Sequence, residues 1–245
     1  MTTPCNLSII IPAYNEARTI PSMAARVTQY LEGLPLSWEL IIVNDGSQDT
    51  TAEEAASAAR AIGPDRVRLL QHPRNLGKGA AVRTGVLDSK GQFVVFLDAD
   101  GATPIEELGK FLPGLQNGAD VVVGSRRIAG ATIRQHQPRL RQWLGAGYTW
   151  LTNRLVAPGI SDITCGFKAL RREAAHRIFS RMRVTGWSFD AELFYLARRF
   201  GYRVIQIPVT WTDQPNTKVR LSRHALTSLW ELLRIRWTDL TGGYR

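Results

Sequence analysis

The feature that most constrains the fold of this chain is a regular alternation of short apolar runs with segments of helical composition. Five runs rich in Val, Ile, Leu and Phe have the length of buried strands, and helical segments separate them. This succession predicts an α/β fold with a mostly parallel sheet and helices on both faces. The predicted strands are residues 7–11, 38–43, 67–70, 93–97 and 121–123, and the predicted helices are residues 19–31, 50–61, 78–87 and 104–115.

Two of these helices begin with a capping signal. Thr50 with Glu53, and Thr103 with Glu106, have the spacing of a capping box, and Pro104 falls at the first helical position of the second pair. We therefore expect both threonine side chains to cap their helices, and we expect Thr103 to be a cap rather than a metal ligand.

Polar residues follow three of the predicted strands, at residues 12–16, 44–47 and 98–100. Asp, Asn, Gly and Ser are common turn formers, which is one explanation for each cluster taken alone. In a parallel sheet, however, ligands bind beyond the carboxyl ends of the strands. Carboxylates gathered at one such edge repel one another unless a cation lies among them, so the coincidence of three clusters favours a binding site.

Asp98 and Asp100 form the sharpest of these clusters, because they directly follow the apolar run of residues 93–97. An Asp-x-Asp at a strand end directs two hard oxygen ligands into one crevice, which suits Mg2+ or Mn2+. A metal at this position can bridge two phosphates and neutralise a diphosphate leaving group. The pair therefore indicates transfer from a nucleotide-activated donor.

Charge is unevenly divided between the two halves of the chain. The net charge of +10 combines 10 basic and 14 acidic residues before position 126 with 21 basic and 7 acidic residues from there on. A content of 44% hydrophobic and 21% charged residues is that of a globular protein and excludes disorder as the main state. The asymmetry indicates an acidic and a basic region that meet at one cleft, with nucleic acid, a membrane surface or a phosphorylated substrate as partners.

Cysteine content and hydropathy restrict the expected cellular compartment and the expected kind of membrane contact. Cys5 and Cys165 are the two cysteines and lack CxxC spacing, so neither a disulfide framework nor a zinc site is indicated, and we expect a reducing compartment. The longest uncharged stretch, residues 1–15, contains Asn, two Pro and several hydroxyl residues, so we read it neither as a signal peptide nor as a spanning helix. We therefore expect any membrane contact to be peripheral.

Four motifs together resemble the inverting family 2 glycosyltransferases of GT-A fold: residues 8–16 (SIIIPAYNE), 42–50 (IVNDGSQDT), 75–79 (NLGKG) and 98–103 (DADGAT). The resemblance extends from about residue 7 to about residue 236, and it implies a single domain over residues 1–245. Residues 1–125 would bind nucleotide-sugar and metal, and residues 126–245 the acceptor. Residues 162–168 (DITCGFK) and 187–193 (WSFDAEL) make the chain most similar to dolichyl-phosphate β-glucosyltransferases and bacterial polyprenyl-phosphate relatives.

This resemblance implies a donor site. Pro12, Tyr14 and Glu16 would form a wall of the nucleotide pocket, and Asp45 would hold the base or ribose. Tyr14 offers an aromatic face, and Asp45 accepts hydrogen bonds from an imide N–H or a ribose hydroxyl. For Glu16 the alternative is an acid favoured by a helix dipole. Lys78 would face a donor phosphate from a glycine loop, although a solvated lysine is an equal interpretation.

In the same resemblance, Asp98 would contact the sugar or nucleotide and share the metal, Mg2+ or Mn2+, with Asp100 as its principal ligand. Related mannosyltransferases usually place Gln two positions after the second Asp, where this chain has Ala102. Diphosphate and water would then complete the metal coordination. The difference favours UDP-glucose over GDP-mannose as donor.

The basic half is expected to hold the acceptor. Arg126 follows the fifth predicted strand and can grip a phosphate through two parallel hydrogen bonds, with Arg139 or Arg141 as a second acceptor-phosphate ligand. A lipid monophosphate oxygen is already anionic, so this transfer needs no dedicated base. Asp190 and Glu192 are the candidate bases for a hydroxyl acceptor, with helix capping or a paired surface acid as the alternative.

The turn-rich segment of residues 211–220 has the composition of a lid, from which Lys218 would close on the donor diphosphate. A solvated loop lysine is an equally good interpretation of Lys218.

Two amphipathic stripes extend the lipid interpretation. Both have helical spacing, combine Trp and Leu with flanking Arg, and suit a helix in a bilayer interface, although core packing is the usual fate of such stripes. We expect a peripheral protein on the anionic cytoplasmic face of a membrane, with a membrane-anchoring partner protein as a further expectation. The stripes are Leu140, Trp143, Leu144, Gly147, Tyr148, Leu151 and Leu155, and Leu226, Leu229, Trp230, Leu233 and Trp237.

Two other functions stay open on the sequence. The same pocket can serve another sugar nucleotide or a soluble hydroxyl acceptor. A noncatalytic protein that binds polyanions or membranes is a remote alternative, because a degenerate site has no need of clustered carboxylates. Nucleic acid is accordingly not expected as a partner.

Overall fold

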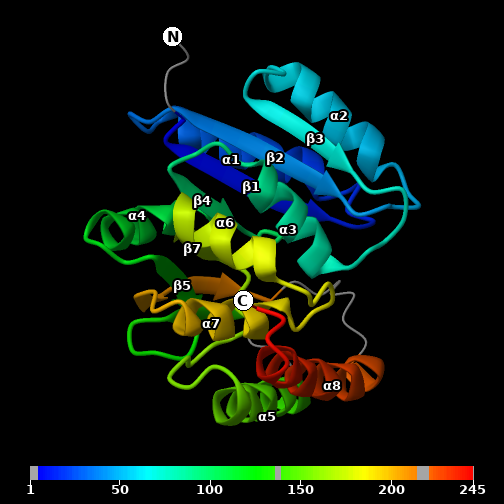
Figure 1. Ribbon diagram of the computed structural model, residues 1–245. Helices are drawn as coiled ribbons and strands as arrows, with labels where there is room; N and C mark the ends of the chain where they lie inside the picture. Colours follow the sequence, from blue (N-terminus) through cyan, green and yellow to red (C-terminus); the bar gives the residue numbers. More distant parts are fainter. Residues whose placement is uncertain (1–4, 136–138, 214–220, 245) are drawn as a thin grey trace.

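The computed structural model describes residues 5–135, 139–213 and 221–244, and for residues 139–141 and 221–226 it describes the backbone alone. Figure 1 shows a central sheet with helices on both faces. The seven strands have the order β3-β2-β1-β4-β7-β5-β8, and β7 is antiparallel to both of its neighbours. The strands are β1 (Leu7–Ala13), β2 (Trp38–Asn44), β3 (Val67–Gln71), β4 (Phe93–Phe96), β5 (Val121–Ser125), β7 (Lys168–Arg171) and β8 (Val204–Pro208).

The five predicted strands are confirmed as β1 to β5, and the parallel pairs among them follow from the βαβ succession. The prediction did not include β7 and β8, or the small sheet of β6 (Thr132–Gln135) and β9 (Thr210–Thr212). Polar residues interrupt these short strands, as Gln206 does in the middle of β8, and β7 begins with a lysine. Neither feature gives the apolar run that marked the other strands.

The helices form layers on the two faces of the sheet. One hydrophobic cluster joins α1, α2 and α4 to one face, and a second cluster joins α3, α6 and α7 to the other. Two further helices, α5 and α8, lie side by side outside α7 (Figure 1). The helices are α1 (Ile20–Glu32), α2 (Thr51–Ile62), α3 (Lys78–Asp88), α4 (Leu108–Gln116), α5 (Arg139–Leu155), α6 (Arg172–Arg181), α7 (Phe189–Arg199) and α8 (Leu221–Leu240).

The predicted capping of α2 is wrong. Thr50 occupies the cap position, but its side chain makes no capping hydrogen bond. Instead the carboxylate of Asp49 accepts a hydrogen bond from the backbone N–H of Thr51 at 3.1 Å. The acid one position earlier reaches the same helix end, so the threonine hydroxyl is not needed there.

The predicted start of the fourth helix is also wrong. A 3-10 turn (Ile105–Glu107) precedes α4, and Pro104 is the residue before that turn rather than the first residue of an α-helix. The carboxylate of Glu106 pairs with the guanidinium of Arg26 on α1 at 2.9 Å, where a capping box would turn it back to the chain. The ion pair between α1 and the 3-10 turn thus takes the place of the hydrogen bond that a capping box would form.

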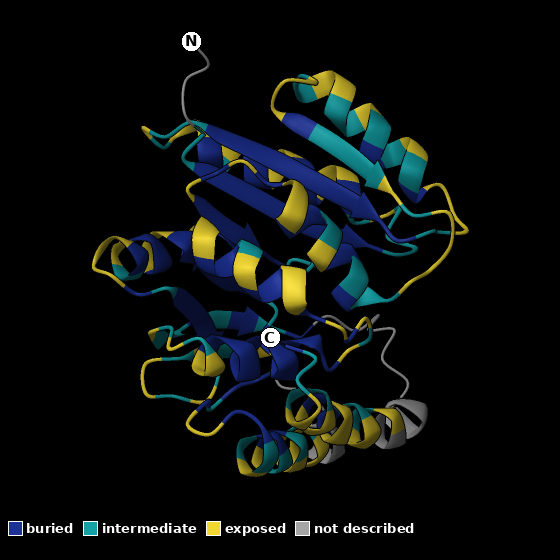
Figure 2. Cartoon of the chain, in the orientation of Figure 1, coloured by how far each residue is buried: buried dark blue, intermediate teal, exposed yellow. Residues whose placement is uncertain are grey.

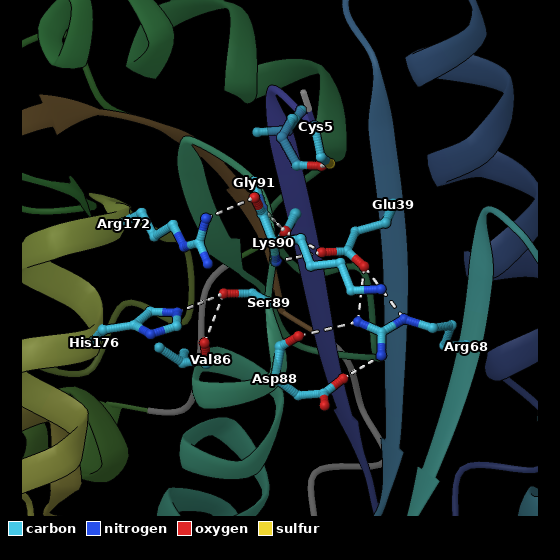
Figure 3. A network of polar contacts seen from close by, with 12 residues as sticks. Cys5, Glu39, Arg68, Val86, Asp88, Ser89, Lys90, Gly91, Arg172 and His176 are labelled. Atoms are coloured by element: carbon cyan, nitrogen blue, oxygen red, sulfur yellow. Dashed lines mark hydrogen bonds and ion pairs between the residues drawn. The ribbon is translucent and has the colours of Figure 1, made fainter. Parts of the chain in front are cut away.

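A polar network closes the amino ends of the central strands (Figure 3). The buried carboxylate of Glu39 accepts hydrogen bonds from the hydroxyl of Ser8 at 2.6 Å, the backbone N–H of Lys90 at 2.7 Å and the guanidinium of Arg68 at 2.8 Å. Ser8 in turn accepts a hydrogen bond from the N–H of Gly91. Burial alone would raise the pKa of Glu39, but these donors hold it below its ordinary value.

The outer helices bury one side each and expose the other (Figure 2). On α8, Leu232 and Ile235 are fully buried in the core, whereas the predicted stripe lies outside, with 68% exposure for both Trp230 and Trp237. The described part of the α5 stripe is divided. Its members Tyr148, Leu151 and Leu155 pack against the core, whereas Trp143 and Leu144 are exposed. The side chains of Leu140 and Leu226 lie outside the described residues.

Candidate active site

The site is built at the carboxyl ends of the parallel strands. Asp98 and Asp100 follow β4, and Lys78 is the first residue of α3, which packs against β1 and β2. The ammonium of Lys78 lies 2.6 Å from Oδ1 of Asp98 and 5.2 Å from the ring centre of Trp187. The predicted donor lysine and the predicted metal pair are therefore brought together.

The surroundings of the two carboxyl groups of the Asp-x-Asp shift their pKa values in opposite directions. Burial would raise the pKa of Asp98, but the neighbouring ammonium of Lys78, with Lys168 and Arg126, lowers it. Burial and the adjacent charge of Asp98 raise the pKa of Asp100 to about 6. The backbone N–H of Ala102 donates to Asp100 at 2.9 Å. Among the described residues, Asp98 therefore has a cationic partner in Lys78, whereas Asp100 forms no ion pair.

These residues fit a divalent cation. The described residues contain no group of three or more His, Cys, Asp or Glu side chains able to hold a metal by themselves. Mg2+ commonly takes one or two carboxylates and completes its coordination with substrate phosphates and water. Two crowded carboxylates, one with a raised pKa, suit that mode of binding.

Sequence reasoning assigned no role to Lys168, although the residue is part of the quoted DITCGFK motif. Its side chain is fully buried at the start of β7, where the ammonium lies 2.8 Å from Oδ1 of Asp190 and donates to the backbone oxygen of Cys165. Burial raises the pKa of Asp190 despite this partner. A lysine at the end of this motif was the signal available in the sequence, but its partner lies on α7, 22 residues later.

Gly166 brings the backbone of the same motif against the metal pair. A Cβ built on Gly166 would lie 2.1 Å from Oδ2 of Asp98, which is far inside van der Waals contact. The absence of a side chain at this position therefore allows the carboxylate of Asp98 to take its place. This requirement also had no signal in the sequence beyond the glycine itself.

Arg126 lies at the end of β5 and is held by a buried acid. Its guanidinium makes two hydrogen bonds of 2.7 Å to the fully buried carboxylate of Asp162, and a third bond of 2.9 Å to the hydroxyl of Thr164. The ring centre of Trp211 lies 5.2 Å from the guanidinium carbon. Although burial opposes it, pairing with Asp162 raises the pKa of Arg126, so the side chain is charged and fixed in direction.

Asp45 is buried beneath the glycine loop. Its carboxylate accepts hydrogen bonds from the backbone N–H groups of Leu76 and Gly77, each at 2.9 Å, and lies 2.7 Å from Nδ1 of His72. These contacts make Asp45 an organiser of the loop that precedes Lys78. The sequence prediction that Asp45 contacts the base or ribose stays a prediction, and His72 was not predicted at all.

The residues expected to form a wall of the nucleotide pocket lie at the end of β1 and in the loop that follows it, next to the loop after β2. Pro12 is buried in β1, and Tyr14 and Glu16 follow it half-buried. The backbone N–H of Glu16 donates to the hydroxyl of Thr51 at 2.7 Å, while its carboxylate accepts a hydrogen bond from the hydroxyl of Thr19 at 2.6 Å. The loops after β1 and β2 are therefore joined, as a shared nucleotide pocket requires.

Glu192, in the first turn of α7, is held by backbone groups and by the C-terminal residues. Its buried carboxylate accepts hydrogen bonds from the backbone N–H groups of Arg183 and Val184 and from the hydroxyl of Tyr244. Tyr244 is itself buried, so these bonds fasten the C-terminal residues to the start of α7. The role of Glu192 as a base stays a prediction, and these contacts give it a structural role.

Three predicted residues lie outside the described part of the structure. They are the side chains of Arg139 and Arg141, and the whole of Lys218. In the described residues, no helix has the length and apolar character needed to cross a membrane.

Comparison with known proteins decides the family. The model of glycosyl transferase family 2 matches residues 8–179, which is more than half of the chain. The chain belongs to glycosyltransferase family 2. This membership confirms the resemblance read from the sequence and makes the protein a glycosyltransferase.

Family 2 relatives of similar sequence carry a common name. A dolichyl-phosphate beta-glucosyltransferase of Trichomonas vaginalis is 39% identical over 88% of this chain, which spans 66% of that relative. The enzymes of that name from Mus musculus and Homo sapiens are each 36% identical over 98% of this chain, which spans 77% of each.

Solved structures of other proteins share the GT-A fold predicted from the sequence. Mannosyl-3-phosphoglycerate synthase from Rubrobacter xylanophilus has a TM-score of 0.70 at 18% identity and covers 97% of this chain, which covers 75% of it. Glucosyl-3-phosphoglycerate synthase from Mycobacterium tuberculosis, in complex with Mn2+, UDP and glucosyl-3-phosphoglycerate, has a TM-score of 0.67 at 22% identity. It covers 93% of this chain, which covers 80% of it. At these identities the likeness establishes the fold.

Proposed function

We propose that this family 2 enzyme transfers glucose, with inversion, from UDP-glucose to a polyprenyl monophosphate and forms a lipid-linked β-glucosyl phosphate. The observation that carries the proposal is the crowded carboxylate pair Asp98 and Asp100 at the strand ends, with Lys78 beside it. Such a pair offers two oxygen ligands to a divalent cation, and a cation there suits a nucleoside diphosphate. The names of the relatives support the sugar and the lipid acceptor.

The first half of the chain, residues 1–125, would bind the donor. Tyr14, Glu16 and the β1 residue Pro12 would flank the nucleotide, while Asp45 fixes the glycine loop and contacts the base or ribose. Lys78 would contact the donor diphosphate. Asp98 and Asp100 would hold Mg2+ or Mn2+, which when bound neutralises the charge that develops on the leaving diphosphate.

The second half, residues 126–245, would bind the acceptor. Arg126 would hold the acceptor phosphate, and its pairing with Asp162 would fix the guanidinium before the acceptor arrives. Arg139 or Arg141 would add a second contact to the phosphate.

The chemical step needs positioning more than proton removal. A phosphate oxygen of the acceptor attacks the anomeric carbon of glucose from the face opposite to the diphosphate. The new C–O bond forms as the bond to the diphosphate breaks, and UDP leaves with the electron pair. The attacking oxygen is already anionic near neutral pH, so no base is required. The pairing of Asp190 with Lys168 agrees with this interpretation.

The exposed apolar residues of α5 and α8 support peripheral contact with an anionic membrane on its cytoplasmic face. Trp143 is 78% exposed, and Trp230 and Trp237 are each 68% exposed. Tryptophan on a helix with arginine beside it is typical of an interfacial helix. Such a contact would bring a polyprenyl phosphate to the basic half of the chain. A membrane-anchoring partner protein remains part of the proposal.

A donor and acceptor panel tests this function. Purified protein in mild detergent is incubated with radioactive UDP-glucose, GDP-mannose or another UDP-sugar, and with a short-chain polyprenyl phosphate or 3-phosphoglycerate. We expect a radioactive lipid from UDP-glucose that requires Mg2+ or Mn2+, is lost with a chelator and is a β-anomer by NMR. Absence of a lipid product with every donor would refute the lipid acceptor, and transfer to 3-phosphoglycerate alone would identify a soluble acceptor.

A further inference from the structure

A second basic feature lies away from the Asp98 rim, where the C-terminal halves of α5, α7 and α8 meet. It is a cavity of about 720 Å³. Four guanidinium groups and a single carboxylate line it, contributed by three helices. They are Arg154 of α5, Arg198 and Arg199 of α7, and Arg236 and Asp239 of α8.

This cavity is separate from the proposed acceptor-phosphate site. Asp190 lies in the first turn of α7 and pairs with Lys168 near the metal pair, whereas Arg198 lies at the other end of the same helix. Eight residues of α-helix span about 12 Å. Arg198 therefore lies about 12 Å along α7 from Asp190, and Arg126 does not line the cavity.

The cavity carries an excess of positive charge on exposed arginines. Its one carboxylate, Asp239, lies 3.0 Å from Nε of Arg199 and accepts a hydrogen bond from the hydroxyl of Tyr195. The guanidinium of Arg236 lies 5.9 Å from the ring centre of Tyr195. Among the side chains that the structure describes, Arg154 and Arg198 make no ion pair, nor does Arg236. Guanidinium groups without an ion-pair partner suit a phosphate, which they bind through parallel hydrogen bonds.

The surroundings of the cavity indicate the source of that phosphate. Trp150 lines the cavity and is 70% exposed, and on α8 Trp237 is 68% and Leu240 is 77% exposed. Exposed tryptophan settles at the headgroup level of a bilayer, which is also the level of lipid phosphates. A phosphate attached to a lipid would reach the arginines while the apolar side chains enter the same bilayer.

We infer that this cavity binds the phosphate headgroup of an anionic membrane lipid. The inference rests on the membrane contact proposed above and adds a defined site to it. Neutral bilayers would be held by the apolar residues of α5 and α8 alone. Anionic bilayers would be held by these residues and by the four arginines together.

Vesicle binding of a double variant tests the site. Arg154→Gln/Arg198→Gln is compared with wild type in flotation assays on vesicles of phosphatidylcholine, and on vesicles with roughly one third phosphatidylglycerol. We expect the variant to lose about thirtyfold in affinity for the anionic vesicles, since each basic side chain near such a surface contributes roughly fivefold. Its binding to neutral vesicles should stay unchanged. Equal affinity of variant and wild type for anionic vesicles would overturn the inference.

A matched control removes the same charge elsewhere. Arg60→Gln/Arg181→Gln alters two exposed arginines on α2 and α6 that do not line the cavity. This control should keep wild-type affinity for the anionic vesicles, and thermal melts should show that both double variants are folded. A loss in the control as large as that in the cavity variant would assign binding to net charge and contradict the site.

Two further experiments are needed. The first distinguishes a defined binding site from a diffuse positive surface, and the second distinguishes a lipid headgroup from free phosphate. Arg154→Lys/Arg198→Lys keeps the charge but not the paired hydrogen bonds, so we expect it to recover only part of the affinity. Full recovery would indicate a diffuse positive surface. Inorganic phosphate, titrated in calorimetry, should bind weakly, and tight binding that depends on these arginines would identify a free phosphate as the occupant.

The outcome does not depend on the proposed reaction. Vesicle binding needs no turnover, so it decides the headgroup site even if no donor gives a lipid product. In detergent with a short-chain acceptor, the Arg154→Gln/Arg198→Gln variant should keep wild-type transfer. An active enzyme whose vesicle binding ignores these arginines would refute the headgroup site and leave the reaction standing.

Discussion

The two ends of the same sheet surround their carboxylates in opposite ways. At the amino ends, Glu39 is surrounded by donors from Ser8, Lys90 and Arg68, and its pKa is lowered. At the carboxyl ends, Asp98 and Asp100 are close enough that burial and mutual repulsion raise the pKa of Asp100 to about 6. At the amino ends the protein itself supplies the donors that stabilise the carboxylate. At the carboxyl ends an external cation can bind the carboxylates and relieve their repulsion.

This difference separates a structural acid from a functional one. A carboxylate with a full set of donors stabilises the fold, because its charged form is favoured by folding. A carboxylate crowded by another acid destabilises the fold at neutral pH and gains when a ligand brings positive charge. The following changes test the contrast, beginning with the largest expected effect.

Replacement of Asp100 by Ala should give the largest loss. Without this oxygen ligand the charge on the leaving diphosphate is poorly neutralised, so we expect kcat/KM for lipid-linked product to fall by about a thousandfold. Asp65→Asn, at an exposed position on the other end of the molecule, should keep wild-type kinetics. Full activity of the Asp100→Ala variant would refute the role assigned to this residue.

Gly166→Ala should give the second-largest loss of activity. The added methyl group would lie 2.1 Å from Oδ2 of Asp98 and displace that carboxylate. Misplacement of a reacting group by about 1 Å costs on the order of a hundredfold in rate, so kcat/KM should fall by about that factor. Gly147→Ala on α5 is the control, since its new Cβ would meet no atom within 4 Å. An unchanged rate in the Gly166→Ala variant would show that Asp98 is free to move.

Glu39→Gln tests the amino ends of the strands, where donors of the protein surround the carboxylate. The amide keeps the size of the side chain but loses the charge, so we expect the free energy of unfolding at pH 7 to fall by about 2 kcal/mol. The stabilisation by Glu39 is present above its ordinary pKa of 4.5 and is lost as pH falls through its lower folded value. Urea titrations should therefore show the variant and wild type converging below about pH 4. A difference that persists in acid would assign the effect to packing.

Asp100→Asn should give the smallest effect and the opposite sign. This change removes one of two repelling charges, so in the absence of divalent cations we expect the variant to be more stable by about 1 kcal/mol, or about 2–4 °C in Tm. Added Mn2+ should raise the Tm of wild type and leave the variant unchanged. If both amide substitutions destabilised the protein, the two ends of the sheet would be equivalent after all.

Much of the fold was accessible from local patterns. The five apolar runs became β1 to β5, and the polar residues that follow them meet at one edge, because the carboxyl ends of parallel strands share an edge. The pairs formed over long sequence distances were not accessible. Lys168 with Asp190, Arg126 with Asp162, and Asp45 with His72 each join separate elements. No periodicity in the chain marks such partners.

The sequence by itself determined that the site would be acidic, that it would lie at the strand ends, and that two helices would carry Trp and Leu at helical spacing. The tertiary structure decided which side of each helix faces outward. On α8 the core takes Leu232 and Ile235 and leaves Trp230 and Trp237 exposed, whereas on α5 it takes Tyr148 from the predicted stripe. Helical spacing fixes which side chains share a face, but only packing against the core and the neighbouring helix selects the face that is buried.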